Sequence, residues 1–295
     1  MTDPQGGPVP RTGTQRGLAT LTALFALAGC GTSSSTATSS LTGSTIVVGI
    51  VDDAPGLAFG DRNPAGFDID LMNAVREKLG TPVAPTILTA ADRAGYLKSK
   101  KATLVISSYS ITARRNKEGI DFAGPYMVSP QALLVRARGP RIAAKSDLKG
   151  KSVCTAKTTT GSTVPIPGAD MSTHPATTRD CVDLLTSGRT DAVFTDALIL
   201  YGYTHAYPGQ FKVIFSGVFG ELQYYGIGLL GNRHADCLKL NDVISDYLRT
   251  QWRHDFLDTL QDAAAAYRAS DASAGDFESQ FKPKDSDMAN LSCKL

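Results

Sequence analysis

The chain has 295 residues, enough for one large domain or two modest ones. Its 42% hydrophobic and 20% charged residues are ordinary values for a globular protein. A net charge of +2 is too small to indicate nucleic acid or an anionic surface as a partner, and no basic cluster is interleaved with aromatic residues. The sequence therefore predicts no nucleic-acid binding.

The N-terminal 29 residues have the layout of a secretory signal. Arg11 and Arg16 precede an apolar run from Leu18 to Ala28, which is too short to span a bilayer comfortably. The run leads into Leu-Ala-Gly-Cys, which resembles a bacterial lipobox. That resemblance implies a lipidated Cys30 that anchors the protein at the outer face of the cell membrane. An ordinary signal peptide followed by a chance cysteine is the alternative.

Residues 30–44 are predicted to be a flexible tether. Between Gly31 and Ser44 nearly all residues are Ser, Thr, Gly or Ala, which bury little apolar surface. Such a coil spans roughly 20 Å on average. It would lift a folded domain off the membrane and leave that domain free to turn.

Predicted strands and helices alternate from Thr45 onward. β-Branched apolar runs predict strands, and a helix beginning near Asp68, the candidate cap, ends at Gly80. This alternation is typical of a parallel, doubly wound sheet. The expected elements are a strand at Thr45–Val51, the helix to Gly80, a strand at Val83–Leu88, a helix near Ala90–Lys98 and a strand at Thr103–Ile106.

Hydroxyl residues follow the last of these strands and lead into a basic segment. Open α/β sheets bind ligands at the carboxyl ends of their strands, and an arginine can hold a carboxylate with two parallel hydrogen bonds. The segment Ser-x-Ser-Ile-Thr-x-x-Arg resembles one in the extracytoplasmic amino-acid-binding proteins of ABC importers. The resemblance implies that Ser108, Ser110 and Arg115 bind the ligand's α-carboxylate, while Arg114 faces solvent. A surface turn with two solvated arginines is the alternative.

Further segments resemble the same family in order and spacing, from about Thr45 to Leu260. The resemblance implies an α/β, two-lobed, type II periplasmic-binding-protein-like fold, with a mostly parallel sheet flanked by helices in each lobe and two hinge strands. Lobe 1 would comprise residues 45–131 and 229–295, and lobe 2 residues 132–228. The segments are Gly-Phe-Asp-Ile-Asp-Leu from Gly66, Asp-Phe-Ala-Gly-Pro-Tyr from Asp121, Asp147–Val153, Gly188–Asp196 and Tyr-Gly-Ile-Gly from Tyr225.

The resemblance also implies ligand-binding residues in the second lobe and one in the first. Asp196 would accept the ligand's α-ammonium, although a helix cap is the alternative. Thr160, and also Thr159, would present hydroxyl and backbone N–H groups to the carboxylate. Lys157 would pair with an acidic ligand side chain or be a solvated lysine. Phe59 would pack on the ligand or belong to the core.

The sequence departs from the family after this threonine loop. Pro165, Pro167 and Gly168 interrupt what is usually a helix, so that helix should be short or absent. The next helix is predicted at Thr177–Ser187.

Four cysteines remain once Cys30 is set aside for lipid, an even number for an exported chain. The pairs Cys154–Cys181 and Cys237–Cys293 are favoured because each would lie within one lobe of the implied architecture. Four free thiols are the alternative. No metal site and no cofactor are expected, since no Cys-x-x-Cys or His-x-x-x-His spacing occurs.

The resemblance implies a monomeric binding protein, not an enzyme, that captures a polar amino acid by cleft closure and delivers it to an ABC permease. Its Pro-Gly-Leu loop, Val-Cys-Thr segment and Lys157 are most similar to the glutamate/glutamine-binding type, so glutamate, glutamine, aspartate or asparagine is the expected ligand. One alternative is a ligand-sensing module for a membrane signalling protein. Another is a dehydratase-like enzyme on the same scaffold, although no Gly-x-Ser-x-Gly elbow is present.

Overall fold

The computed structural model describes residues 39–42, 44–60, 63–139, 142–270 and 277–295. The expected signal peptide, Cys30 and most of the expected tether lie outside these residues. Residues 37–295 form one compact unit, which contains both sheets of the protein. Within the described part of the chain, no helix is both long and apolar enough to cross a membrane.

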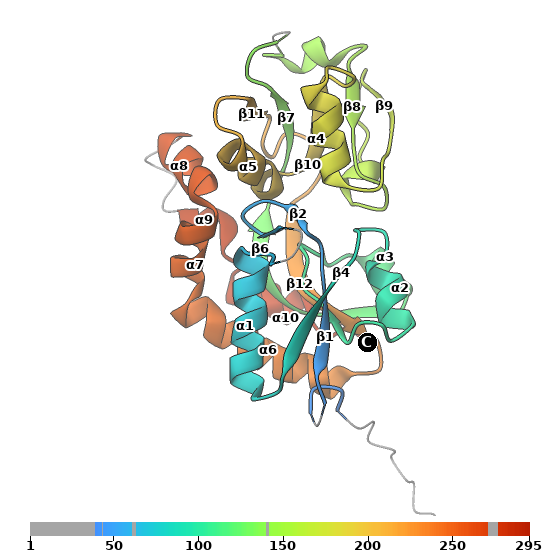
Figure 1. Ribbon diagram of the computed structural model, residues 1–295, viewed down its shortest axis with the longest axis vertical. Helices are drawn as coiled ribbons and strands as arrows, with labels where there is room; N and C mark the ends of the chain where they lie inside the picture. Colours follow the sequence, from blue (N-terminus) through green and yellow to red (C-terminus); the bar gives the residue numbers. More distant parts are fainter. Residues whose placement is uncertain (1–38, 43, 61–62, 140–141, 271–276) are drawn as a thin grey trace, which may run out of the picture. The chain divides into compact units, whose positions relative to one another are not determined.

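The first sheet has the strand order β4-β1-β5-β12-β6 (Figure 1). Strand β1 pairs in parallel with β4 and β5, whereas β12 runs antiparallel to β5 and β6. The strand bounds are β1 Ile46–Ile50, β4 Val83–Ile87, β5 Leu104–Val105, β6 Ile120–Ser129 and β12 Gln223–Leu230.

The second sheet has the order β11-β7-β10-β8-β9. Strand β7 is antiparallel to β10 and β11, and β8 is parallel to β9 and β10. The bounds are β7 Gln131–Arg136, β8 Ser152–Cys154, β9 Asp170–Thr173, β10 Ala192–Asp196 and β11 Phe211–Ile214. A separate hairpin joins β2, Asp53–Ala54, to β3, Ala58–Phe59.

Both sheets are therefore mixed, and the expectation of mostly parallel sheets is too simple. The parallel strands β1, β4 and β5 were predictable because helices separate them in the sequence. Strands β6, β7 and β12 belong to the segments that pass between the two sheets, and those segments run antiparallel to their neighbours. Only Pro130 separates β6 from β7, so the chain changes sheets within one residue. The return occurs before Gln223, since all of β12 lies in the first sheet.

Helices cover both faces of the first sheet. Residues of α1 and α6 pack with Val48 and Ile50 on one face, and Leu97 of α2 packs with Val105 and Phe122 on the other. The helix bounds are α1 Phe67–Leu79, α2 Arg93–Lys98, α3 Ala113–Lys117, α4 Thr178–Thr186, α5 Ala197–Ala206, α6 His234–Thr250, α7 Trp252–Thr259, α8 Gln261–Ser270, α9 Phe277–Phe281 and α10 Asp285–Leu291, with short 3-10 turns η1 Lys145–Leu148 and η2 Gly161–Thr163.

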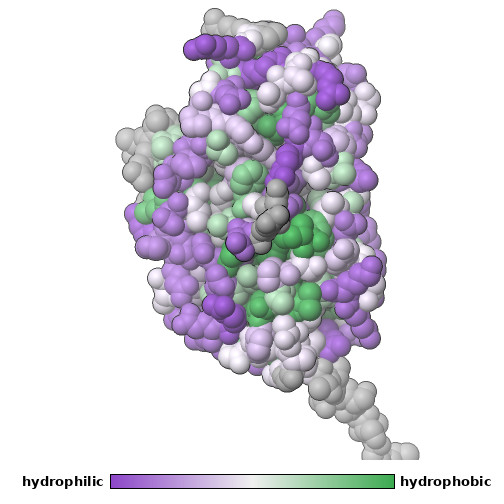
Figure 2. Space-filling view, viewed as in Figure 1, coloured by the Kyte–Doolittle hydropathy of each residue, from purple (hydrophilic) through white to green (hydrophobic). Residues whose placement is uncertain are grey.

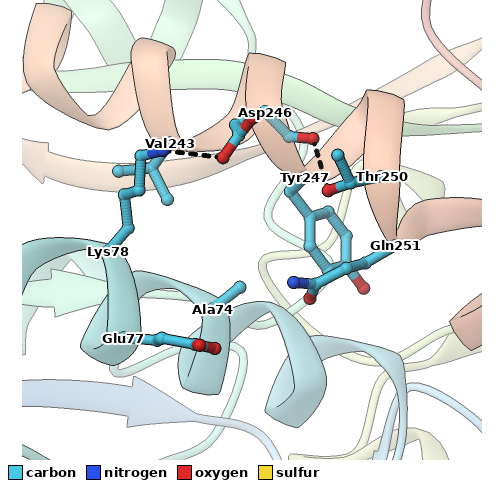
Figure 3. Close-up of a pocket in the computed structure, with 8 residues that line it drawn as sticks. All are labelled: Ala74, Glu77, Lys78, Val243, Asp246, Tyr247, Thr250 and Gln251. Atoms are coloured by element: carbon cyan, nitrogen blue, oxygen red, sulfur yellow. Dashed lines mark hydrogen bonds and ion pairs between the residues drawn. The ribbon is translucent and has the colours of Figure 1, made fainter.

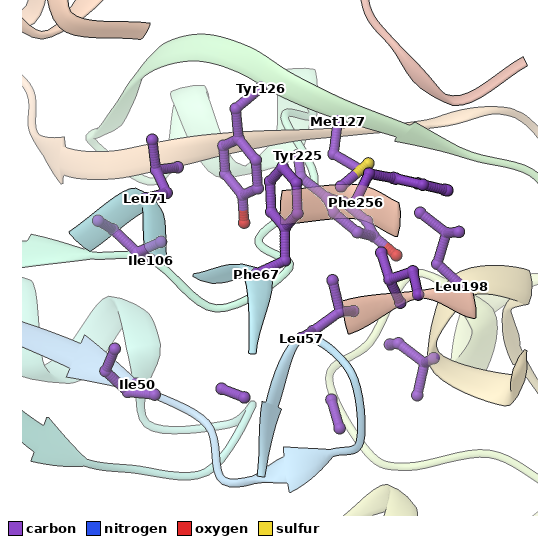
Figure 4. Packing of buried hydrophobic residues seen from close by; sticks show 14 of the residues in the cluster. Ile50, Leu57, Phe67, Leu71, Ile106, Tyr126, Met127, Leu198, Tyr225 and Phe256 are labelled. Carbon is purple, nitrogen blue, oxygen red and sulfur yellow. The ribbon is translucent and has the colours of Figure 1, made fainter. Parts of the chain in front are cut away.

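One apolar cluster runs from the first sheet into the second. It joins Leu57 and Phe67 near the start of α1 to Leu198 of α5, as Figure 4 shows. Tyr126 and Tyr225, from the neighbouring strands β6 and β12, lie in the same cluster with ring centroids 6.2 Å apart. A single apolar core therefore extends under both sheets.

The two ends of the described part of the chain, residues 39–41 and the C-terminal residues, are attached to the first lobe more tightly than the sequence predicted. Ser39 and Ser40 donate hydrogen bonds to Asp236 of α6, and Leu41 is fully buried, so the end of the predicted tether is part of the fold. At the other terminus, the backbone N–H groups of Lys294 and Leu295 donate to Asp121 at the start of β6.

Both predicted disulfides are present. Cys154 of β8 bonds to Cys181 of α4, and Cys237 of α6 bonds to Cys293 in the C-terminal segment.

The described surface is mostly hydrophilic in the view of Figure 2, with apolar side chains gathered near its middle. Ile87, at the end of the edge strand β4, is 41% exposed.

Candidate functional site

A small cavity lies between segments that follow strands of the two sheets. Its volume is about 30 Å³, which is enough for water but small for an amino acid. An amino acid therefore enters only if the lining segments move apart. The first sheet's side contributes Val51, Asp53, Ala54, Ala90, Arg93, Ser108 and Ser110, and the second sheet's side contributes Thr159, Thr160, Thr178, Thr195, Asp196 and Ile199.

Ser108 is held in an uncommon backbone conformation at this cavity. Its φ is +45°, in the left-handed region that non-glycine residues rarely adopt. The backbone N–H of Ser108 donates to Asp68 Oδ2 at 2.9 Å, and the Tyr126 hydroxyl donates to Asp68 Oδ1 at 2.7 Å. The sequence suggested that Asp68 caps α1, but this is wrong, because Gly66 occupies the cap position. Burial raises the pKa of Asp68 to about 6 against the effect of its hydrogen bonds.

Arg115 lies behind Ser110 rather than on the cavity wall. Thr112 caps α3 by accepting from the backbone N–H of Arg115, which fixes the start of the side chain. The guanidinium donates to the Ser110 carbonyl and lies 4.4 Å from the ring centroid of Tyr109. Burial, with Arg93 nearby, lowers the pKa of Arg115 to about 9. Arg114 is exposed, as predicted.

Arg93 is a cavity residue that the sequence analysis missed. It is 5% exposed, begins α2 and lies 4.5 Å from the ring centroid of Tyr109. Its guanidinium donates to the carbonyl oxygens of Ala90 and Ser107, and burial lowers its pKa. A charged residue soon after a predicted strand was the available signal, because ligand sites lie beyond the carboxyl ends of strands.

Asp196 lies at the carboxyl end of β10, on the opposite wall. It occupies the N-cap position of α5, but its side chain makes no capping bond, so the alternative role as a helix cap does not explain it. The Tyr225 hydroxyl donates to Oδ2 at 2.8 Å, and Gln131 Nε2 donates to Oδ1 at 3.3 Å. Burial raises the pKa of Asp196 to about 6, while these bonds and the charges of Arg115 and Arg93 oppose the rise.

The predicted threonine loop also lines the cavity. Thr160 Oγ1 accepts from Gln131 Nε2 at 3.3 Å, whereas the Thr159 hydroxyl donates to the Ala156 carbonyl within its own turn. The interrupted segment that follows forms only the 3-10 turn η2 and the strand β9, as Pro165 and Pro167 indicated.

Asp53 is the second cavity residue that the sequence analysis missed. It follows β1, is 7% exposed, and accepts a hydrogen bond from the backbone N–H of Thr178 at the start of α4, at 2.7 Å. Burial raises its pKa despite this bond. Its backbone carbonyl accepts from the Tyr203 hydroxyl of α5 at 2.6 Å. Asp53 therefore connects the first sheet's side of the cavity to α4 and α5, two helices that pack on the second sheet.

Besides Arg115, two further predicted ligand residues, Lys157 and Phe59, lie outside this cavity. Lys157 is exposed and does not line it. Phe59 is half-buried, and the guanidinium of Arg179 lies 5.1 Å from its ring centroid, so in this structure Phe59 packs against α4. A larger groove of about 300 Å³ lies between α1 and α6, where Lys78 pairs with Asp246 (Figure 3), and it contains none of the predicted site residues.

The cavity combines groups suited to a small zwitterion. Buried guanidinium groups attract a carboxylate, and a buried carboxylate that is ionised attracts an ammonium group. Ser108 and Ser110 face Thr160 and Asp196 across the cavity. Among the described residues, no group of three or more His, Cys, Asp or Glu side chains could hold a metal ion.

Comparisons with known proteins agree with this arrangement. The sequence model of the bacterial extracellular solute-binding proteins, family 3, matches residues 46–287. The glutamate-binding protein GluB of Corynebacterium glutamicum is 35% identical over 201 residues, which cover 62% of this chain and 66% of GluB. The glutamine-binding protein of Geobacillus stearothermophilus is 27% identical, over 67% of this chain and 77% of that protein.

Solved structures include similar folds. An ancestral arginine-binding protein bound to glutamine superposes with a TM-score of 0.66 at 27% identity, covering 74% of this chain and 98% of that one. The prediction of a two-lobed α/β binding-protein fold is confirmed, and each of the two sheets forms the centre of one lobe.

Proposed function

The chain belongs to the bacterial extracellular solute-binding proteins, family 3, and from that premise we propose that it captures a polar amino acid between its lobes and delivers it to an ABC permease. Glutamate, glutamine, aspartate and asparagine are the proposed ligands. The observation that carries the proposal is the buried carboxylate of Asp196, which faces Ser108, Ser110 and Arg93 across one cavity.

The ligand's α-carboxylate binds to Ser108, Ser110 and Arg115, with the hydroxyl of Thr160 and the loop at Thr159 on the other lobe. A guanidinium has five N–H donors, and Arg115 uses one on the Ser110 carbonyl, so donors remain for a carboxylate. To reach one, the side chain must turn from behind Ser110 toward the cavity. The α-ammonium binds to Asp196. At about 4 Å such a charge pair is worth roughly 4 kcal/mol at an effective dielectric of 20.

Arg93 extends the proposal to the ligand's side chain. It is a buried cation on the cavity wall, and its guanidinium donates hydrogen bonds to two backbone carbonyls. Asp53 and Asp196 also act on Arg93 through their charge, and a second carboxylate on the ligand, as in glutamate or aspartate, would add to that attraction. Lys157 and Phe59 do not line the cavity, so they would contact the ligand only if the cleft changes shape when a ligand binds.

The cavity in this structure is too small for an amino acid, so the lobes must first separate and then close around the ligand by a hinge motion. Delivery to the permease would follow this closure. A lipid on Cys30 would keep the protein at the outer face of the membrane, near the permease. The binding protein itself is proposed to be a monomer and to catalyse no reaction.

Isothermal titration of the purified protein with a panel of amino acids tests this function. We expect heat with glutamate or another acidic or amide amino acid, and little with apolar ones. The assignment fails if glutamate, aspartate, glutamine and asparagine all give no heat.

A further inference from the structure

Gln131 lies beside the cavity without lining it. It is the first residue of β7, directly after the chain crosses from one sheet to the other, and it is fully buried. In the antiparallel pairing of β7 with β10, Gln131 lies opposite Asp196. Its Nε2 lies 3.3 Å from Asp196 Oδ1 and 3.3 Å from Thr160 Oγ1.

We propose that Gln131 is a positioning residue that holds the Asp196 carboxylate and the Thr160 hydroxyl in the orientation in which they meet the ammonium and carboxylate groups of the ligand. This inference rests on the proposed function, because it assigns a role within the same site. Gln131 does not touch the ligand and acts through the other two residues.

The hydrogen bonds of the Gln131 side-chain amide support this role, because its nitrogen is paired and its oxygen is not. Nε2 donates to two partners, whereas the buried Oε1 has no hydrogen-bond partner among the described residues. An unpaired buried oxygen destabilises the fold, and an apolar side chain of the same shape would avoid that cost. Turning the amide over would bring Oε1 against the Asp196 carboxylate, where like partial charges repel. The glutamine is therefore explained by its donors.

Gly220 provides the space that this orientation needs. A Cβ atom on Gly220 would lie 1.8 Å from Gln131 Oε1, far inside contact distance. Gly220 is itself exposed, in the loop that leads to β12, and has a φ of +71°. An exposed loop glycine thus controls the position of a buried amide, which in turn contacts Asp196.

The charged and titratable groups around Asp196 come from three other elements. They are Tyr225 on β12, Arg93 on α2 and Arg115 on α3; Tyr225 donates a hydrogen bond, and the two arginines act through their charge. Gln131 is the neutral donor to the carboxylate oxygen that Tyr225 does not reach. Removing the Gln131 donor should therefore disfavour the ionised form of Asp196, the form that binds an ammonium group.

The first test is Gln131→Met, which keeps the length of the side chain and removes its donors. We expect affinity for L-glutamate and for L-glutamine to fall about tenfold at pH 7, as for loss of one hydrogen bond to a charged group. The pH below which affinity falls should rise by about one unit. Gln223→Met is the matched control, because Gln223 is also buried but its side chain donates to the Glu221 carbonyl, away from Asp196. It should leave this pH unchanged.

The second test leaves Gln131 in place. Gly220→Ala pushes the amide away and should shift the pH dependence in the same direction as Gln131→Met. Gly209→Ala is its control, since Gly209 has a similar φ of +73° but a Cβ there meets nothing within 4 Å. A backbone effect alone would move both variants equally, and that result would overturn the role of Gly220.

Carboxylate NMR of the ligand-free protein separates this proposal from the proposed function. If the parent protein binds neither glutamate nor glutamine, the choice of ligand is wrong, but the titration of Asp196 still reports on Gln131. We expect Gln131→Met to raise the pKa of Asp196 by about one unit. Two results would contradict the positioning role and leave Gln131 a structural residue. One is an unchanged pKa of Asp196 in Gln131→Met. The other is a loss of affinity and thermal stability without a change in the pH dependence of affinity.

Discussion

Arg93 and Arg115 are two buried guanidinium groups over one aromatic ring, that of Tyr109, yet they have different surroundings. Arg93 lines the cavity, whereas Arg115 lies behind Ser110. We therefore expect Arg93→Met to weaken glutamate binding about 100-fold, as for loss of one partner of a buried charge pair, and glutamine binding less than tenfold. Arg115→Met should weaken both ligands alike. Titration calorimetry with both amino acids measures the ratio, and equal losses in Arg93→Met would contradict a contact with the side chain.

Asp196 makes binding dependent on pH. Its pKa is about 6 in the ligand-free protein because of burial, and only its ionised form attracts an ammonium group. Affinity should therefore be constant from about pH 7 to 9 and fall toward tenfold per pH unit below 6. Calorimetric titrations across this range measure the midpoint. Affinity that stays constant down to pH 5 would contradict an ionised Asp196 at the ammonium site.

Asp196 should also reduce the stability of the ligand-free protein at neutral pH. A carboxyl whose pKa is raised in the folded state binds more protons than in the unfolded state between about pH 4 and 6, so the free energy of unfolding falls as pH rises through that window. Asp196→Asn should therefore raise the free energy of unfolding at pH 7 by about 1–3 kcal/mol while it abolishes tight binding. Urea unfolding measures this gain.

Asp70 provides the comparison for that variant. Its pKa is also raised to about 6, by burial and by Asp255 and Asp258, but it lies on α1 away from the cavity. Asp70→Asn should change stability in the same direction and leave affinity unchanged. A destabilised Asp196→Asn protein would show that the hydrogen bonds from Tyr225 and Gln131 outweigh the burial of the charge.

At this scale the sequence predicted those cavity residues that belong to recognisable segments. Of the predicted ligand residues, five line the cavity and three do not, and ligand binding by any of them stays a prediction. The five are Ser108, Ser110, Thr159, Thr160 and Asp196, and the three are Arg115, Lys157 and Phe59. Arg93 was missed because its burial depends on the ring of Tyr109, sixteen residues along the chain, and nothing in the local pattern marks an arginine at a helix start as buried.

The two disulfides act on different elements and should have separable effects. Cys154–Cys181 joins β8, which leads into the Thr159–Thr160 loop, to α4, whose Thr178 lines the cavity. Cys237–Cys293 joins α6 to the C-terminal segment, where the Cys293 N–H donates to the Phe122 carbonyl of β6. Removal of the first should weaken ligand binding, and removal of the second should reduce stability alone.

Replacing both Cys237 and Cys293 by Ser should lower the free energy of unfolding by about 4 kcal/mol in a chain-entropy model, because the disulfide closes a loop of 56 residues. That corresponds to a melting temperature lower by about 10 °C. Calorimetry measures the melting temperature and titration the affinity. A variant with both Cys154 and Cys181 replaced by Ala that binds normally would contradict the link between that disulfide and the cavity.

At the level of elements, the sequence predicted what local pattern determines. The helix at Thr177–Ser187 is observed as α4 at Thr178–Thr186, where Thr177 and Asp180 cap it reciprocally. The directions of β6, β7 and β12 were not predicted, because they depend on how the chain crosses between the lobes. The burial of Leu41 was also missed, since the preceding residues Ser39 and Ser40 are held by Asp236 of α6, almost 200 residues away.

One of the contacts between the lobes is made by the turn that joins β2 to β3, beside those of α5 with α8. Asp53 accepts from Thr178 of α4, and Pro55 lies against α5 so closely that a Cβ on Gly202 would lie 1.7 Å from its carbonyl oxygen. The turn itself belongs to the first lobe, because the Phe67 N–H at the start of α1 donates to the Gly56 carbonyl. These contacts are made between protein groups, so they stabilise the closed arrangement of the lobes.

Gly202→Ala tests this consequence directly. Alanine is favoured over glycine inside a helix by about 1 kcal/mol, so α5 should form at least as well, but the turn at Pro55 can no longer approach it. The closed arrangement then becomes less favourable relative to the open one, and affinity falls by the same factor for every ligand, because the bound form is the closed one. We expect a larger radius of gyration of the ligand-free protein in small-angle X-ray scattering and a several-fold weaker affinity. Gly95→Ala in α2, where a Cβ has open space, should change neither. If Gly202→Ala leaves both the radius and the affinity at their original values, the turn does not control closure.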